Sequence, residues 1–392
     1  MSFSHLLQEV IADPAAPPAP HGVMGFLEQP HIKWAVPIPI LLAIAPLIWL
    51  FFRSTWKELD EEAYQHRRAL QEQRESVPPS SGGTAYRGSK PKAPKPFSGV
   101  DYRPLIALAL GAFILTVQEY YGGRVTYDQV VRVWLFKKEQ LKPGGFVSLA
   151  KYDELYALAY WALTRMAGYV LPLVVWRLFF RRDSVLDFGL RTRGFTEHAW
   201  IYAMFVTIMI PVMMVVAQQP DFGTYYPFYR NATRSWMDFG IWEVLYIGQF
   251  FCLEIFFRGW WVRATRSFGA GAIFSMVVPY CMIHFGKPYL EACGAIVAGT
   301  VLGSLSMKTR SIYAGFLVHI TVAILMDLLA LRNRAALPRL LTPEGTKVFV
   351  FTRVDIVLWV VWVFALTLLL WKLVKTWPQI RAYFTGLGKR AV

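Results

Sequence analysis

Cysteine and charge are both scarce in this chain of 392 residues. The three cysteines, Cys252, Cys281 and Cys293, lie within or beside apolar segments and form no CxxC pair. The sequence therefore predicts neither a disulfide framework nor a zinc site built on cysteine. Charged residues make up only 17% of the chain against 55% hydrophobic residues, which excludes a soluble protein of this length.

The charge that is present is mainly basic. The formal net charge is +15, which on a soluble protein would suggest a nucleic-acid partner. Here the Lys and Arg residues lie between apolar blocks rather than along one polar face, so we expect them to contact anionic lipid headgroups. The predicted partner is a lipid bilayer, and no nucleic acid is expected.

Long apolar blocks dominate what the sequence does contain. A membrane-spanning helix needs about 20 apolar residues, and somewhat shorter blocks suit helices buried within a bundle. The sequence therefore predicts an all-α, polytopic transmembrane helical bundle of about eight to nine spans. The candidate spans are Trp34–Phe52, Leu105–Val117, Leu155–Phe180, Ala199–Ala217, Ile241–Phe257, Ala270–His284, Leu290–Leu305, Ile312–Leu331 and Ile356–Val374.

The segments between these blocks divide the chain into regions. The N-terminal region, residues 1–53, ends with the first span. Its residues 1–33 are rich in Pro and Ala and lack the basic start and apolar core of a cleavable signal peptide. Within residues 54–102, Lys57–Glu75 is predicted to form a short surface helix, and residues 76–98 form a flexible linker rich in Pro, Gly, Ser and Lys. The remaining regions are accessory transmembrane helices (103–196), a core with polar residues at membrane depth (197–335), and the last span with a basic tail (336–392).

Basic residues also indicate an orientation. The loops after the first, third, fifth and seventh spans hold Arg53–Arg103, Arg181–Arg193, Arg258–Arg266 and Lys308–Arg310. The positive-inside rule then predicts that these loops and the C-terminal tail are cytoplasmic, with the membrane itself a bacterial inner (cell) membrane. The opposite loops are basic as well, over Arg124–Lys151 and Arg332–Arg353.

The stretch FFCLEIFFRGWW, residues 250–261, places two opposite charges inside an apolar block. Glu254 lies within the block, and Arg258 follows one helical turn later. Either charge at mid-membrane costs about 2.5–3.5 kcal/mol, and an i,i+4 pair offsets part of this cost. One interpretation is a structural pair in which Arg258 reaches the membrane interface beside Trp260 and Trp261. The other is a functional site, which the polar residues of the next blocks favour.

Four further polar residues interrupt these next blocks. His284 closes the sixth block, Glu291 opens the seventh, and His319 and Asp327 lie about two turns apart on the eighth. Structural explanations exist for His284 (an interfacial hydrogen bond), Glu291 (a helix-start ion pair with Lys287) and Asp327 (contact with solvent). Together, however, these residues are costly at membrane depth unless they converge on a polar cavity. One Glu and two His are sufficient to activate water, either as a general base or through a metal.

These blocks carry motifs that resemble those of the CAAX-protease/bacteriocin-processing (CPBP) family, the Abi-type glutamic intramembrane proteases. The family motifs are EExxxR, usually ending in FRG, then FxxxH, then HxxxN. The residues that match are Glu254, Arg258 and Gly259 in the first motif, His284 with Tyr280 in place of Phe in the second, and His319 in the third. The resemblance covers roughly Ala199–Leu331 and implies that residues 197–335 are a catalytic-type core.

Two positions depart from the family pattern. Leu253 stands where the family has the glutamate that is usually assigned as catalytic, and Ala323 stands where it has asparagine. We expect a branch of the family that works with Glu254 and uses Asp327 in place of the asparagine. Neighbouring helix positions point about 100° apart, so Glu254 replaces the missing carboxylate only if the helix rotates or kinks.

The resemblance implies an intramembrane endopeptidase, a hydrolase that acts on a membrane protein or a lipidated peptide. We expect Glu254 to act as general base, and His284 and His319 to hold the water and stabilise the oxyanion. Supporting roles fall to Arg258, Asp327 and Glu291. Because no HExxH motif is present, water activation without a metal is favoured, and Zn²⁺ held by Glu254, His284 and His319 is the alternative.

Two other classes of function stay open. Leu253 and Ala323 favour a pseudoenzyme, which would be a non-catalytic membrane adaptor or immunity-type protein of the same fold. A transporter that uses Glu254, Arg258 and Asp327 as coupling groups is the third interpretation.

Overall fold

The structure is a computed structural model that describes residues 35, 37–75, 101–143, 147–181, 183–192, 195, 198–217, 222–287, 289–333 and 353–388. Within these residues the regular elements are all helical, and no strand occurs. Seven of the helices are long and apolar enough to cross a membrane. They are α4 (Pro37–Glu75), α5 (Arg103–Tyr121), α8 (Leu149–Phe179), α12 (Trp236–Glu254) with its continuation, α15 (Tyr289–Thr309), α16 (Tyr313–Asn333) and α17 (Arg353–Gly388).

Shorter helices complete the bundle. Two of them, α10 (Ala199–Val216) and α14 (Gly271–Met282), are apolar. Each of the nine predicted blocks coincides with a helix, so the predicted all-α polytopic bundle is confirmed, and the protein is a multi-pass integral membrane protein. The remaining elements are α6 (Arg124–Thr126), η1 (Tyr127–Val131), α7 (Arg132–Leu141), η2 (Val185–Phe188), α11 (Phe222–Tyr225), η3 (Arg230–Thr233), η4 (Ile255–Trp261), α13 (Val262–Ala264) and η5 (Arg266–Phe268).

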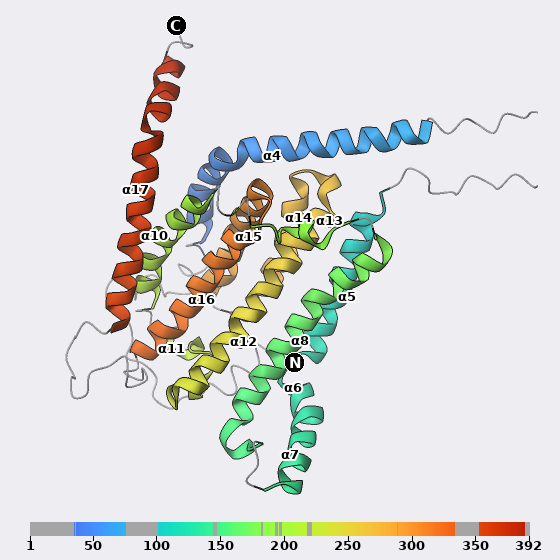
Figure 1. The fold of residues 1–392 in the computed structure, drawn as a ribbon, viewed down its shortest axis with the longest axis vertical. Coiled ribbons are helices and arrows are strands. Elements are labelled where there is room, and N and C mark those ends of the chain that lie inside the picture. Colours follow the sequence, from blue (N-terminus) through green and yellow to red (C-terminus); the bar gives the residue numbers. More distant parts are fainter. Residues whose placement is uncertain are drawn as a thin grey trace, which may run out of the picture.

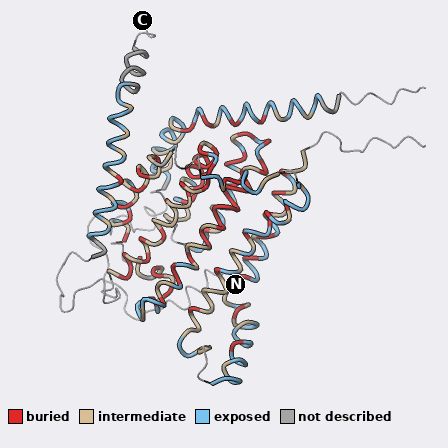
Figure 2. The backbone as a smooth tube through the Cα atoms, viewed as in Figure 1, coloured by how far each residue is buried: buried red, intermediate tan, exposed pale blue. Residues whose placement is uncertain are grey.

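One continuous helix runs through the centre of the bundle. α12 passes without a break into the π-helical segment η4 and then into α13 (Figure 1). This helix is largely buried, whereas α17 is mostly exposed (Figure 2). Trp260 of η4 is fully buried and meets Trp176 of α8 edge-on, with ring centroids 5.9 Å apart. Exposed apolar side chains on α17, such as Phe364 and Trp371, suit a helix that faces lipid.

The charged part of α4 lies across one end of the bundle (Figure 1). Lys57–Glu75, predicted as a separate surface helix, is helical but continues the first span without a break. Its side chains hold the turn between α13 and α14. Asp60 Oδ1 accepts from the Ala270 N–H at 2.8 Å, and Arg67 donates to the Ser267 carbonyl at 2.5 Å.

The loops predicted to share one side of the membrane meet at this same end. Arg310, between α15 and α16, forms an ion pair with Glu62 of α4. The Ile312 N–H donates to the Gly189 carbonyl at 3.0 Å. These contacts bring together the loops after the first, third, fifth and seventh spans, as alternating spans require. That this end faces the cytoplasm stays a prediction, and the predicted linker over residues 76–98 lies outside the described residues.

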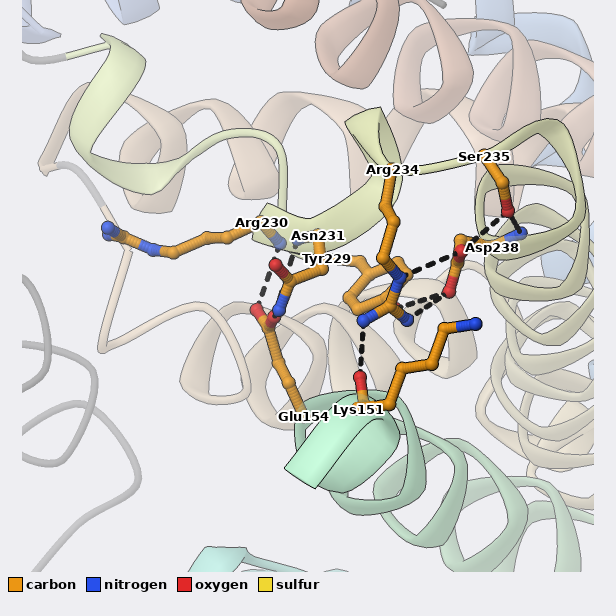
Figure 3. A network of polar contacts seen from close by, with 8 residues as sticks. All are labelled: Lys151, Glu154, Tyr229, Arg230, Asn231, Arg234, Ser235 and Asp238. Carbon is orange, nitrogen blue, oxygen red and sulfur yellow. Dashed lines mark hydrogen bonds and ion pairs between the residues drawn. The ribbon is translucent and has the colours of Figure 1, made fainter. Parts of the chain in front are cut away.

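A network of polar contacts holds the start of α12 at the other end of the bundle (Figure 3). Ser235 caps the helix, because its Oγ accepts from the Asp238 N–H at 3.1 Å. The buried Asp238 carboxylate accepts from Tyr229 Oη at 2.8 Å and from Arg234 Nε at 3.1 Å. Glu154 of α8 accepts from the first backbone N–H of η3 at 2.9 Å. The loop before α12 is thereby fixed against α8.

We expect Asp238→Ala to lower the thermal stability of the purified protein, because it removes the buried acceptor of Arg234 and Tyr229. The expected cost is about 2–3 kcal/mol. Asp187→Ala is the matched control, since it removes an exposed i,i+4 ion pair with Arg191 at 2.8 Å and should cost less than about 0.5 kcal/mol. Thermal unfolding in detergent measures both variants, and equal losses would contradict the prediction.

Candidate functional site

The central helix changes geometry at the predicted centre of the site. Glu254 is the last residue of α12, and the next seven residues form the π-helix η4. A π-helical turn carries an extra residue and therefore rotates the positions after it relative to those before it; such turns often occur at functional sites. η2 also approaches the helix here, because a Cβ built on Gly259 would lie 2.5 Å from the Phe188 carbonyl oxygen. The glycine of the FRG motif thus allows η2 and η4 to touch.

Glu254 and His319 are directly joined. The Glu254 side chain is fully buried, and its Oε1 accepts from His319 Nδ1 at 3.0 Å and from Arg258 Nη1 at 2.9 Å. Its Oε2 has no hydrogen-bond partner among the described residues and faces Gly315 of α16, where a Cβ would lie 3.1 Å away. Arg258 is fully buried too, so it does not extend to the membrane interface. The first and third motifs therefore meet at one carboxylate oxygen.

Tyr280 connects the second motif to the other two. Its ring lies 3.9 Å from Cζ of Arg258, and its centroid is 4.8 Å from the His284 ring and 6.4 Å from the His319 ring. The Tyr280 carbonyl accepts from His284 Nδ1 at 2.8 Å. Because a carbonyl only accepts, Nδ1 of His284 carries the proton, and Nε2 of the neutral ring keeps a free lone pair. All three motifs gather around one aromatic ring.

Asp327 lies on the same helix as His319 but contacts other groups. Its Oδ2 accepts from Trp242 Nε1 at 2.9 Å, and its Oδ1 accepts from the Phe228 N–H at 3.4 Å. Both oxygens are thus engaged by α12 and by the loop before η3. Ala323, the position of the family asparagine, is buried beside this cluster.

Glu291 forms the ion pair with Lys287 that the sequence suggested, at 2.8 Å. It also accepts from Tyr226 Oη at 2.9 Å. Burial raises the pKa of Tyr226, and the negative charge of Glu291 raises it further, so this phenol is a neutral donor at physiological pH. Glu291 therefore connects the turn after α14 to the loop after α11.

A cavity of about 890 Å³ lies beside these residues. Side chains of α5, α8, α12 and α14 line it, and most of them are apolar or aromatic. His284 and Leu253 belong to its wall, whereas Glu254 and His319 do not. Phe250 is also part of the wall, and its ring centroid lies 4.2 Å from that of His319. The position of the usual family glutamate thus faces the cavity, and Glu254 faces α16.

The part of the chain that the structure describes contains no group of three or more His, Cys, Asp or Glu side chains that could hold a metal ion. The Tyr280 ring contacts both His284 and His319, and Oε1 of Glu254 is shared by Arg258 and His319. As arranged, these side chains do not converge as Zn²⁺ ligands. The Zn²⁺ alternative stays a prediction.

Gln249 and Glu243 are polar residues of α12 that do not belong to any of the three motifs. Both are buried, and both interrupt the apolar block Ile241–Phe257. Their signal in the sequence is the same as that of Glu254, a polar residue at membrane depth. Gln249 lines the cavity one turn before Leu253.

We expect Gly259→Ala to destabilise the protein by about 1–3 kcal/mol, because the added methyl group would meet the Phe188 carbonyl. Gly240→Ala is the control on the same helix, where a Cβ has nothing within 4 Å. It should leave thermal stability unchanged or raise it by up to about 1 kcal/mol. If both variants unfold at the same temperature, the close approach of η2 does not matter for stability.

Comparison with known proteins agrees with the motifs. Residues 235–325 match the family model Rce1-like, described as Type II CAAX prenyl endopeptidase Rce1-like. The matched part begins at the cap of α12, ends in α16 and contains all three motifs, so the predicted family resemblance is confirmed there. No curated protein and no solved structure matches the chain. In the helices that carry the site, the chain is therefore similar to the Rce1-like family of CAAX prenyl endopeptidases.

Proposed function

We propose that this protein is an intramembrane endopeptidase that hydrolyses a peptide bond in a membrane-associated protein or lipidated peptide. The observation that carries the proposal is the 3.0 Å contact between Glu254 Oε1 and His319 Nδ1, next to a cavity whose wall includes His284. The match of residues 235–325 to a protease family supports it.

Glu254 is proposed to act through His319. A carboxylate paired with Arg258 accepts the Nδ1–H of His319, which leaves the lone pair on Nε2. That nitrogen then takes a proton from water, as in other carboxylate–histidine pairs. The sequence led us to expect Glu254 itself as the base; the geometry favours a role in orienting the histidine and stabilising its protonated form.

His284 supplies a second acceptor for the same water. Its Nε2 lone pair accepts one water hydrogen while His319 Nε2 removes the other, and the water oxygen attacks the scissile carbonyl carbon. His319 returns the proton to the leaving amine, so that a carboxylic acid and an amine result. The largely apolar wall around His284 lowers the local dielectric constant and so strengthens these polar contacts.

Asp327 and Glu291 are proposed as supporting residues that hold the surrounding loops. Asp327 ties the loop before η3 to α16, and Glu291 ties the His284 turn to Tyr226. We also propose that the end of the bundle crossed by α4 is cytoplasmic, in a bacterial inner membrane, as the basic loops indicate.

We expect Glu254→Gln, His284→Ala and His319→Ala each to reduce cleavage of a farnesylated CAAX peptide by about 10²–10⁴-fold in proteoliposomes. The family description supplies this peptide as the first substrate to test. Glu243→Gln is the matched control, a buried carboxylate on the same helix outside the proposed chemistry. If all three site variants cleave at the wild-type rate, the proposal is wrong.

A non-catalytic adaptor is the second candidate, because Leu253 faces the cavity where the family has a carboxylate. Under this alternative, the wild type and Glu254→Gln are each expressed with the membrane proteins of the host, and both give the same cleavage products. Each protein also keeps a stable partner during purification.

Zinc analysis separates the two ways of activating water. We expect the purified wild-type protein to contain far less than one zinc per chain, and we expect 1,10-phenanthroline to leave cleavage unchanged, because the described residues include no group of three His, Cys, Asp or Glu side chains that could hold a metal ion. Stoichiometric zinc that is lost in both His284→Ala and His319→Ala would favour the metal alternative.

A further inference from the structure

Gln249 is a buried carboxamide whose oxygen has no hydrogen-bond partner among the described residues. Its side chain is 4% exposed. Burying such an acceptor unpaired costs about 1–3 kcal/mol, so native proteins rarely leave one without a reason. Gln249 is also part of the cavity wall, together with His284 and Leu253.

Two other polar side chains on this wall illustrate the contrast, because both have partners. His284 donates to the Tyr280 carbonyl, and Lys287 pairs with Glu291. The amide of Gln118, on the neighbouring helix α5, is paired at both ends: it donates to the Arg165 carbonyl at 3.0 Å and accepts from the Arg165 guanidinium at 3.2 Å. The two buried glutamines therefore differ. Gln118 is satisfied within the protein, and Gln249 is not.

We propose that Gln249 binds the peptide backbone of the substrate and positions it in the cavity beside His284. A carboxamide has one acceptor and one donor group side by side, which matches the N–H and C=O groups of an extended peptide. A lipid tail offers no such groups, so an orphaned amide in a largely apolar wall favours a peptide as the part of the ligand at this position.

This inference rests on the proposed function and makes it more specific. One turn separates Gln249 from Leu253, so both contact the same stretch of the cavity. Leu253 offers an apolar surface there, and Gln249 fixes the register of the chain by its hydrogen bond. Gln249 is therefore a positioning residue, and the chemistry stays with His319 and His284.

A binding experiment tests the hydrogen bond between Gln249 and the peptide backbone without relying on turnover. The probe is a fluorescent farnesylated CAAX peptide, together with versions in which one backbone amide at a time is N-methylated, bound to His319→Ala protein in nanodiscs. If Gln249 accepts a peptide N–H, methylation of one particular amide weakens binding about five- to tenfold. The same methylation has no further effect when Gln249→Leu is added, because the contact is already lost.

Stability provides the second readout. Gln249→Leu should unfold at the wild-type temperature or above it, since it removes an unsatisfied polar group, and Gln249→Asn should recover part of the binding. Gln118→Leu is the matched control; it should lower the unfolding temperature and leave the effect of methylation intact. Methylation effects that are the same with and without Gln249→Leu would overturn the inference. Absence of cleavage by the wild type, with this coupling present, would instead overturn the proposed hydrolysis alone.

Discussion

The central constraint on this molecule is the burial of Glu254 and Arg258 within apolar helices, in one cluster with the partly buried His319. Isolated charges among apolar helices are costly. The contacts of Glu254 with Arg258 and with His319 lower this cost only while they stay short. Those contacts require α16 to approach the end of α12 closely, which Gly315 permits. The guanidinium of Arg258 also packs against the Tyr280 ring, and this contact fixes the position of α14. The arrangement of the central helices therefore follows from how one carboxylate is paired.

Much of the fold could be predicted because it depends on local composition. Every predicted apolar block coincides with a helix, since length and hydropathy alone decide whether a segment can cross a bilayer. The motif residues could also be identified from local composition, because a His or Glu inside an apolar block is rare. The sequence did not indicate that Lys57–Glu75 continues the first span, because its composition alone does not distinguish a separate helix from an extension.

Partners across the bundle could not be predicted. The contact of Asp327 with Trp242 joins residues 85 positions apart, and neither helix contains a local signal for it. The π-helical turn after Glu254 is another such feature, because it coincides with the contact between Gly259 and the Phe188 carbonyl of a distant loop. Whether Leu253 or Glu254 lines the cavity depends on how α12 packs against α16, and so on tertiary structure rather than on spacing.

The contacts of α4 have a consequence for assembly in the membrane. Arg67 and Asp60 belong to the first long helix of the structure, yet their partners, Ser267 and Ala270, come 200 and 210 residues later. During synthesis these polar groups are hydrated until the central helix and its following turn have been inserted. Non-local pairings of this kind form late, after the loop between them has been closed. We therefore expect the charged half of α4 to dock against the turn between α13 and α14 only after that turn has been inserted.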